Sequence, residues 1–160
     1  WEGAVEAAGL DYCHVRTDRQ LESYEEVVFV GYMEELLSAL GRKVVSQKVF
    51  RFHEDICMID FYEPSTGTWI DAKLQVEAAF AGSFLDSRLK FAPRLEVVYL
   101  RGEPRKHGDP RAQLVNVNSL YDKLNANGES YLVKKVGLLA LGYLTPQQRR
   151  DLKYIRESEI

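Results

Sequence analysis

Asp71 and Lys73 stand two residues apart in an otherwise apolar segment, TWIDAKLQ, at residues 68–75. Because side chains alternate between the two faces of a strand, both would point to one side of a sheet, together with Trp69 and Gln75. A carboxylate beside an ammonium group suits the binding of a hard cation and the positioning of a water molecule. The same pair is also typical of a surface ion pair without a function. The groups that the rest of the chain brings to Asp71 decide between these interpretations.

A second carboxylate is expected from the preceding apolar segment, DICMIDFY, at residues 55–62. The residues PSTG at 64–67 have typical turn chemistry and predict a hairpin between the two segments. A hairpin symmetric about this turn places Asp60 opposite Asp71 on the same face. A longer or bulged turn would bring Asp55 to Asp71 instead. Two facing carboxylates repel each other, so whichever acid is adjacent needs a metal ion or a proton.

The segments around this hairpin predict an α/β fold, a mixed central sheet flanked by helices. Apolar residues recur at three and four positions before Gly41, which predicts a helix over residues 21–41. Residues 131–144 fit either a strand or a helix. Asn118 or Ser119 is expected to cap a short helix. The remaining expected elements are strands at 43–50, 95–100 and 113–117, helices at 76–91 and 118–127, and a helical C-terminal tail at 145–157.

The segments GYMEELLSALGRKVV, DICMID and WIDAK, within residues 25–101, resemble the restriction-endonuclease-like PD-(D/E)xK nuclease superfamily. The resemblance implies an αβββαβ core: a helix, a three-stranded meander, a second helix and a fourth strand. It also implies a metal-dependent endonuclease that hydrolyses phosphodiester bonds with Mg²⁺, for which Mn²⁺ substitutes. DNA is the expected substrate and RNA is the alternative. A homodimer is a further implication.

The resemblance also assigns roles to individual residues. The residues expected to act in catalysis are Asp55, Asp71, Lys73 and Glu34. The expected metal ligands are Asp55, Asp71, the backbone carbonyl of Ala72, and Glu34. Asp55 is preferred because the superfamily places this acid at the start of its strand, and Asp60 is the alternative. A solvent-facing position is the alternative for Glu34, and Gln75 is a further polar residue that related nucleases often carry there.

Basic residues flank the proposed site and predict contacts with backbone phosphates. Residues 1–80 carry 7 Lys and Arg against 15 Asp and Glu, whereas residues 81–160 carry 14 against 9, so an acidic half precedes a basic half. This asymmetry suits metal ligands beside a polyanion-binding surface. The candidate nucleic-acid contacts are Lys48, Arg51, Arg88, Lys90, Arg105 and Lys106, with Arg101 and Arg111 in or beside the same charged loop.

Composition is that of an ordinary globular domain. The chain has 160 residues, of which 46% are hydrophobic and 28% charged, and no apolar run reaches membrane-spanning length. Two cysteines without zinc-ligand spacing favour an intracellular protein, and a first residue other than Met suggests a larger parent protein or complex. We expect an extension at 1–22, a nuclease-like core at 23–128 and an extension of the same domain at 129–160. The alternatives to an active nuclease are an inactive nuclease-fold module that binds DNA or partner proteins, and a purely structural α/β domain.

Overall fold

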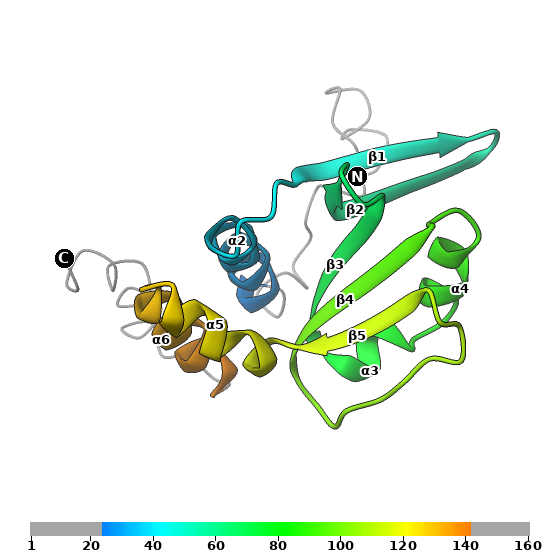
Figure 1. The fold of residues 1–160 in the computed structure, drawn as a ribbon. Coiled ribbons are helices and arrows are strands. Elements are labelled where there is room, and N and C mark those ends of the chain that lie inside the picture. The colour runs from blue at the N-terminus through cyan, green and yellow to red at the C-terminus, as the bar shows by residue number, and fades with distance from the viewer. Residues whose placement is uncertain (1–23, 142–160) are drawn as a thin grey trace, which may run out of the picture.

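A five-stranded mixed sheet forms the centre of the fold in a computed structural model that describes residues 24–141 (Figure 1). The strands are β1 (Val45–Phe52), β2 (Asp55–Glu63), β3 (Thr68–Gln75), β4 (Arg94–Arg101) and β5 (Ala112–Asn116), and they lie side by side in that order. The helices are α2 (Tyr24–Ala39), α3 (Val76–Ala79), α4 (Phe84–Leu89), α5 (Tyr121–Ala126) and α6 (Ser130–Ala140), with a 3-10 turn, η2, at Val117–Leu120. The predicted α/β class is confirmed. The expected extension 1–22 and the expected tail helix 145–157 lie outside the described residues.

The first three strands form an antiparallel meander, and the last two join it in parallel. The predicted hairpin turn between β2 and β3 is present, with the Gly67 N–H donating to the Glu63 carbonyl at 2.9 Å. Gly67 has a φ of +70°, a backbone conformation that glycine adopts without a steric cost. This tight turn sets the register Phe61 opposite Ile70, and therefore decides which acids meet across the two strands.

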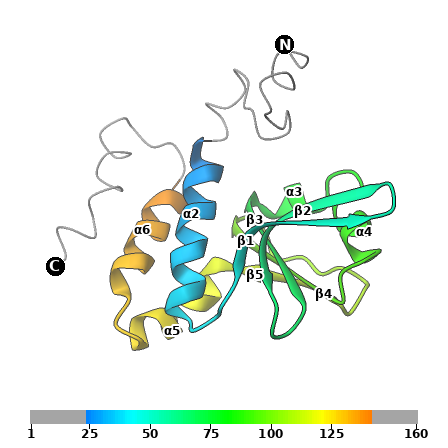
Figure 2. The same cartoon turned by 90° about the horizontal axis from the view of Figure 1, so that it is seen from above.

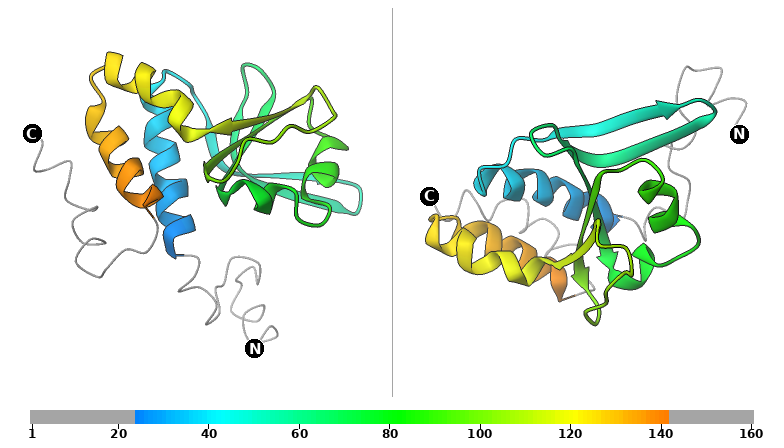
Figure 3. Two further views of the ribbon diagram at one scale, coloured as in Figure 1. Left: turned by 90° about the horizontal axis from the view of Figure 1, so that it is seen from below. Right: turned by 45° about the vertical axis from the view of Figure 1, so that its right-hand side comes forward.

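Helices cover both faces of the sheet and create two apolar cores (Figures 2 and 3). On one face, α2, α5 and α6 form a layer, and the core contains Phe29, Met33, Leu36, Leu37, Phe61, Ile70, Ala72, Val98, Leu100, Leu124, Leu132, Val136 and Leu139. On the other face, α3 and α4 pack on the sheet, and the core contains Ile59, Trp69, Leu85, Leu89, Leu95 and Val97. Alternation along β3 therefore sends Ile70 and Ala72 towards α2, and Asp71 towards α3 and α4.

Two predicted helical segments differ from the structure, and the structure assigns a third segment that was ambiguous. The single helix expected at 76–91 is two short helices, because the chain turns at Gly82, where φ is +54°. The cap expected at Asn118 or Ser119 is Asn116, whose side chain accepts a hydrogen bond from the Asn118 N–H at 2.9 Å. The ambiguous segment 131–144 begins as helix α6, whose buried residues pack on α2.

The strands β2 and β3 separate soon after their turn. Their pairing covers Phe61–Glu63 and Thr68–Ile70, whereas β1 stays paired with β2 as far as Phe52 and Asp55. The β1–β2 hairpin consequently extends away from β3, as the right-hand view of Figure 3 shows. We call the point of separation the β2–β3 fork. Asp60 and Asp71 are the first residues of the two strands within it.

Candidate functional site

The β2–β3 fork is closed by two aspartates whose side chains take the place of strand hydrogen bonds. The Asp60 N–H donates to Oδ1 of Asp71 at 3.2 Å, and the Ala72 N–H donates to Oδ2 of Asp60 at 2.9 Å. Because each carboxylate bonds to the backbone of the opposite strand, the two acids are held next to each other. The symmetric hairpin that placed Asp60 opposite Asp71 is therefore the correct alternative.

The backbone is distorted at the fork. Cys57, Ile59 and Tyr62 all pack with the core under α3 and α4, so the alternation of β2 breaks between positions 59 and 62. Gln47, which the β1–β2 register places opposite Asp60, has a φ of +54°. A non-glycine residue in this region costs of the order of 1 kcal/mol and is typical of turns and functional sites. Asp60 lies within this break in the alternation.

Arg88 of α4 reaches into the fork and neutralises Asp71. Its Nε donates to Oδ2 of Asp71 at 2.5 Å, and its Nη2 donates to the Met58 carbonyl at 3.1 Å. Asp71 is only 3% exposed, so an ionised carboxylate there requires a partner of opposite charge. Arg88 was expected to contact nucleic acid. In this structure its guanidinium instead bridges the two strands where their own pairing has ended.

Lys73 and Arg88 share one aromatic support, Phe84 of α4. The Lys73 Nζ lies 4.3 Å from the centre of the Phe84 ring, and the Arg88 Cζ lies 4.1 Å from it. Cations over an aromatic face are stabilised by the ring quadrupole. Lys73 therefore lies on the same side of the sheet as Asp71, as the alternation predicted. The role of Phe84 has no signal in the sequence, because it depends on where α4 packs.

Asp60 is affected by the charge of its neighbour Asp71. Burial and, after it, the neighbouring Asp71 charge raise the pKa of Asp60 to about 6, although a hydrogen bond from Ala72 and the charge of Lys73 lower it. Oδ1 of Asp60 accepts no hydrogen bond from residues 24–141. Two adjacent carboxylates repel each other, so the pair favours the uptake of a proton or a cation.

Asp55, the preferred partner of Asp71, is not brought to it. Asp55 is exposed and pairs with Phe52 at the far end of the β1–β2 hairpin. It lies five residues from Asp60 along an extended strand, a distance of about 16 Å at 3.3 Å per residue. The turn at 64–67 contains no extra residue that would shift the register, so the bulge that Asp55 needed is absent there.

Glu34 also lies apart from the pair. It is exposed on α2 and accepts a hydrogen bond from the Ser46 hydroxyl of β1 at 3.1 Å. The helical acid whose charge acts on Asp60, raising its pKa, is Glu26. Glu26 precedes Glu34 by eight residues, or about 12 Å along the helix. Both acids flank the same buried stripe, so the sequence offered no reason to choose the earlier one.

The basic residues differ in their contacts and in their exposure. Arg105 stacks on Phe80 of the α3–α4 segment at 3.9 Å, and Lys48 lies 5.7 Å from the Phe50 ring on β1. Arg101 is structural, because it donates to the Leu139 and Ala140 carbonyls at the end of α6. The exposed candidates are Arg51, Lys90, Arg105 and Lys106, and Gln75 is also exposed, at the end of β3.

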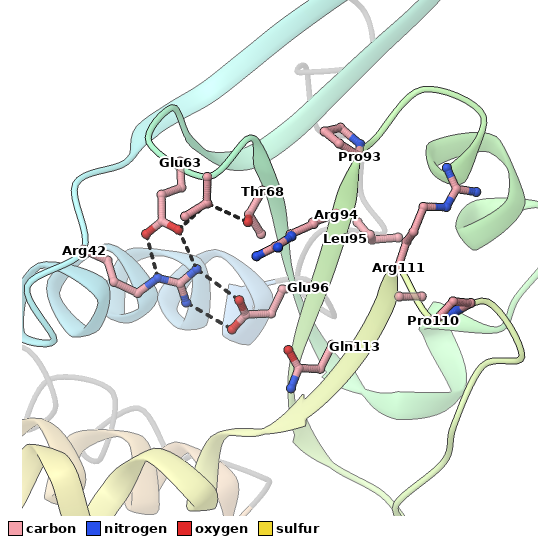
Figure 4. A pocket seen from close by; sticks show the side chains of 12 residues that line it. Arg42, Glu63, Thr68, Pro93, Arg94, Leu95, Glu96, Pro110, Arg111 and Gln113 are labelled. Carbon is pink, nitrogen blue, oxygen red and sulfur yellow. Dashed lines mark hydrogen bonds and ion pairs between the residues drawn. The ribbon is translucent and has the colours of Figure 1, made fainter.

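A pocket of about 780 Å³ lies at the other end of β3 and β4, on the face that α2 covers (Figure 4). Arg42 crosses it and pairs with Glu63 at 2.8 Å and with Glu96 at 3.0 Å. The hydrogen bond from Arg42 lowers the pKa of Glu63. The charged groups of the pocket thus compensate one another, and the pocket is not lined by Asp60, Asp71 or Lys73. We therefore place the candidate site at the fork.

Asp60 and Asp71 are the groups at the fork that could hold a metal ion. Within residues 24–141, no three His, Cys, Asp or Glu side chains gather closely enough to hold a metal ion by themselves. Mg²⁺ usually keeps several water molecules and binds through one or two carboxylates together with substrate phosphates. Asp60 and Asp71 supply two such carboxylates, and Oδ1 of Asp60 has no donor among residues 24–141. The expected ligand Ala72 is adjacent in the strand.

Comparison with known proteins adds no relative: no family model, curated protein or solved structure matches this chain. In the part of the chain that the structure describes, no helix combines the length and apolar content needed to cross a membrane. The functional argument therefore depends on the geometry of the fork.

Proposed function

We propose that this protein is a metal-dependent endonuclease that hydrolyses DNA phosphodiester bonds at the Asp60–Asp71 pair. The observation that carries the proposal is the pairing of these two carboxylates at the β2–β3 fork, with Lys73 on the same face. The order of elements supports it as well. A helix, an antiparallel meander, further helices and a parallel strand follow one another as the PD-(D/E)xK resemblance implies.

Asp60 and Asp71 would hold the cation, with the water molecules and substrate phosphate that complete its coordination. A bound Mg²⁺ would polarise the phosphodiester and lower the pKa of a water molecule. The hydrogen bonds that both carboxylates accept from the backbone would hold them in place before substrate arrives, which is the preorganisation that such chemistry requires.

Lys73 would supply positive charge where negative charge develops on the phosphate, or donate a hydrogen bond to the attacking water. Its position over Phe84 keeps the ammonium group beside the acids instead of in open solvent. Exposed cations near this face, Lys90, Arg105 and Lys106, would bind backbone phosphates without reading the base sequence.

A plasmid-cleavage assay with the full chain tests the proposal. Asp71→Asn keeps the shape of the side chain, and we expect it to lower Mg²⁺-dependent cleavage by at least about 100-fold. Asp55→Asn is the control, since it makes the same change on the neighbouring strand β2, away from the fork, and it should cut like the wild type. Equal cleavage by the wild type and the Asp71→Asn variant would refute the proposal.

A second candidate is a nuclease-fold module that binds DNA without cutting it. The Arg88–Asp71 ion pair favours it, because a guanidinium already supplies the positive charge that the acid needs. Calorimetric titration with Mn²⁺ separates the two. An active site should show binding that Asp71→Asn abolishes, whereas the module should show no binding that depends on Asp71.

A further inference from the structure

Arg88 occupies the place beside Asp71 where a cation is needed. Its guanidinium contacts Oδ2 of Asp71 and the Met58 carbonyl, and its side chain is still 17% exposed. The side chain is therefore accessible to solvent in part while its guanidinium closes the fork. Arg88 is both the internal counter-charge of the site and a cation at its surface.

The side chain of Arg88 can leave the fork without moving its helix. Leu85 and Leu89, on the same short helix α4, are 5% and 6% exposed and anchor it in the second core. Rotation about the side-chain bonds of Arg88 is therefore sufficient, and Phe84 offers a resting surface throughout.

The charges at the fork balance in the observed arrangement. Asp60 and Asp71 carry negative charge, and Lys73 and Arg88 carry positive charge. Addition of a divalent cation leaves an excess of positive charge, which repels the nearest guanidinium. A backbone phosphate entering the site offsets part of this excess and offers two oxygens that a planar guanidinium can contact together.

We propose that Arg88 is an exchangeable counter-ion: it holds Asp71 when no divalent cation is bound, and it turns to a phosphate of the nucleic acid when one is. The inference rests on the proposed function, because it assigns Asp71 to a cation. Since the released guanidinium binds phosphate, cation and nucleic acid each strengthen the binding of the other by the same factor. Arg88 is thus a phosphate-binding residue that is masked in the metal-free protein.

Two titrations of the full chain test this exchange. In the first, calorimetry measures Mn²⁺ affinity without DNA, and we expect Arg88→Gln to bind Mn²⁺ about tenfold more tightly than the wild type. In the second, fluorescence anisotropy measures the affinity for a labelled DNA duplex with and without Ca²⁺, which takes the same kind of oxygen ligands. Ca²⁺ should strengthen duplex binding about tenfold in the wild type and much less in Arg88→Gln.

Arg94→Gln is the charge-matched control. Arg94 is exposed at the start of β4 and lines the pocket on the other face. Its replacement by glutamine removes the same charge as Arg88→Gln without touching the acid pair. It should leave both the Mn²⁺ affinity and the Ca²⁺ effect unchanged. If Arg88→Gln does not fold, Arg88→Lys serves instead, because a lysine cannot bond to Asp71 and the Met58 carbonyl with one planar group. Its Mn²⁺ affinity should then lie above that of the wild type.

Each outcome decides the matter. Equal Mn²⁺ affinity of the wild type and the Arg88 variant, with binding lost in Asp71→Asn, would overturn the exchange and leave Arg88 as a fixed structural clamp. Mn²⁺ binding that appears only in the Arg88 variant would support it. Absence of Asp71-dependent Mn²⁺ binding from both proteins would refute the proposed function and the exchange together.

Discussion

Asp60→Asn is expected to stabilise the protein at neutral pH while removing a residue of its proposed site. The pKa of Asp60 rises from 3.8 to about 6 on folding, through burial and the Asp71 charge. At 1.36 kcal/mol per pKa unit, the ionised side chain opposes folding by about 3 kcal/mol. Asparagine carries no charge and can still accept the Ala72 hydrogen bond. We therefore expect a gain of about 2–3 kcal/mol, or roughly 5–10 °C in Tm.

The gain in stability from Asp60→Asn should grow as the pH rises. An acid whose pKa is raised by folding contributes stability that is fully present below pH 3.8 and is lost as the pH rises through about 6. The difference between Asp60→Asn and the wild type should therefore be near zero at about pH 4 and reach its full size by about pH 7.5. Urea unfolding followed by circular dichroism at both pH values measures it.

Asp55→Asn is the control, because it makes the same change at an exposed position of the same strand, where surface substitutions alter stability by less than about 0.5 kcal/mol. The reasoning would be refuted if Asp60→Asn were no more stable than the wild type at about pH 7.5. A gain of the same size at both pH values would also refute it, since the gain would then have nothing to do with ionisation.

Three further perturbations address the site and the fold around it. Arg42→Gln should lower the free energy of unfolding by about 2–3 kcal/mol at neutral pH. This loss should shrink as Glu63 becomes protonated below its ordinary pKa of 4.5, and urea unfolding at several pH values measures the loss and its pH dependence. Gly102→Ala should cost at least about 2 kcal/mol in the same assay, because φ is +115° and the new Cβ would lie 2.4 Å from Val76, and unchanged stability would contradict this packing. Lys73→Met should reduce cleavage by about 100-fold or more without weakening Mn²⁺ binding, since an ammonium group repels the cation; a parallel loss in calorimetry would make Lys73 a structural residue.

The sheet and its hairpin could be predicted because their signals are local. Thr68–Gln75 was predicted as a strand from alternation, and the 64–67 turn from its residue types, and both are present. The register that pairs Asp60 with Asp71 also follows from the turn alone. The preference for Asp55 depended on a resemblance that places the acid by its position in a motif, and the structure does not bring Asp55 to Asp71. The short turn of this hairpin instead brings Asp60 next to Asp71.

The rest of the site depends on contacts that only the folded chain makes. Arg88 was predicted to face nucleic acid, but the break of the helix near Gly82 sets α4 so that its guanidinium enters the fork. Phe84 reaches Lys73 for the same reason. Glu26 acts on Asp60 because of how α2 crosses the sheet, which its apolar stripe does not specify. Tertiary packing, rather than local pattern, therefore assembles the charges around the two aspartates.

Diffraction from crystals soaked in Mn²⁺, recorded for its anomalous signal, tests the central claim most directly. We predict one Mn²⁺ ion bound by Asp60 and Asp71 at the β2–β3 fork, with the Arg88 guanidinium withdrawn from Asp71. An Arg88–Asp71 ion pair that persists in soaked crystals, with no anomalous peak beside either aspartate, would contradict the claim that these acids form a metal-dependent site.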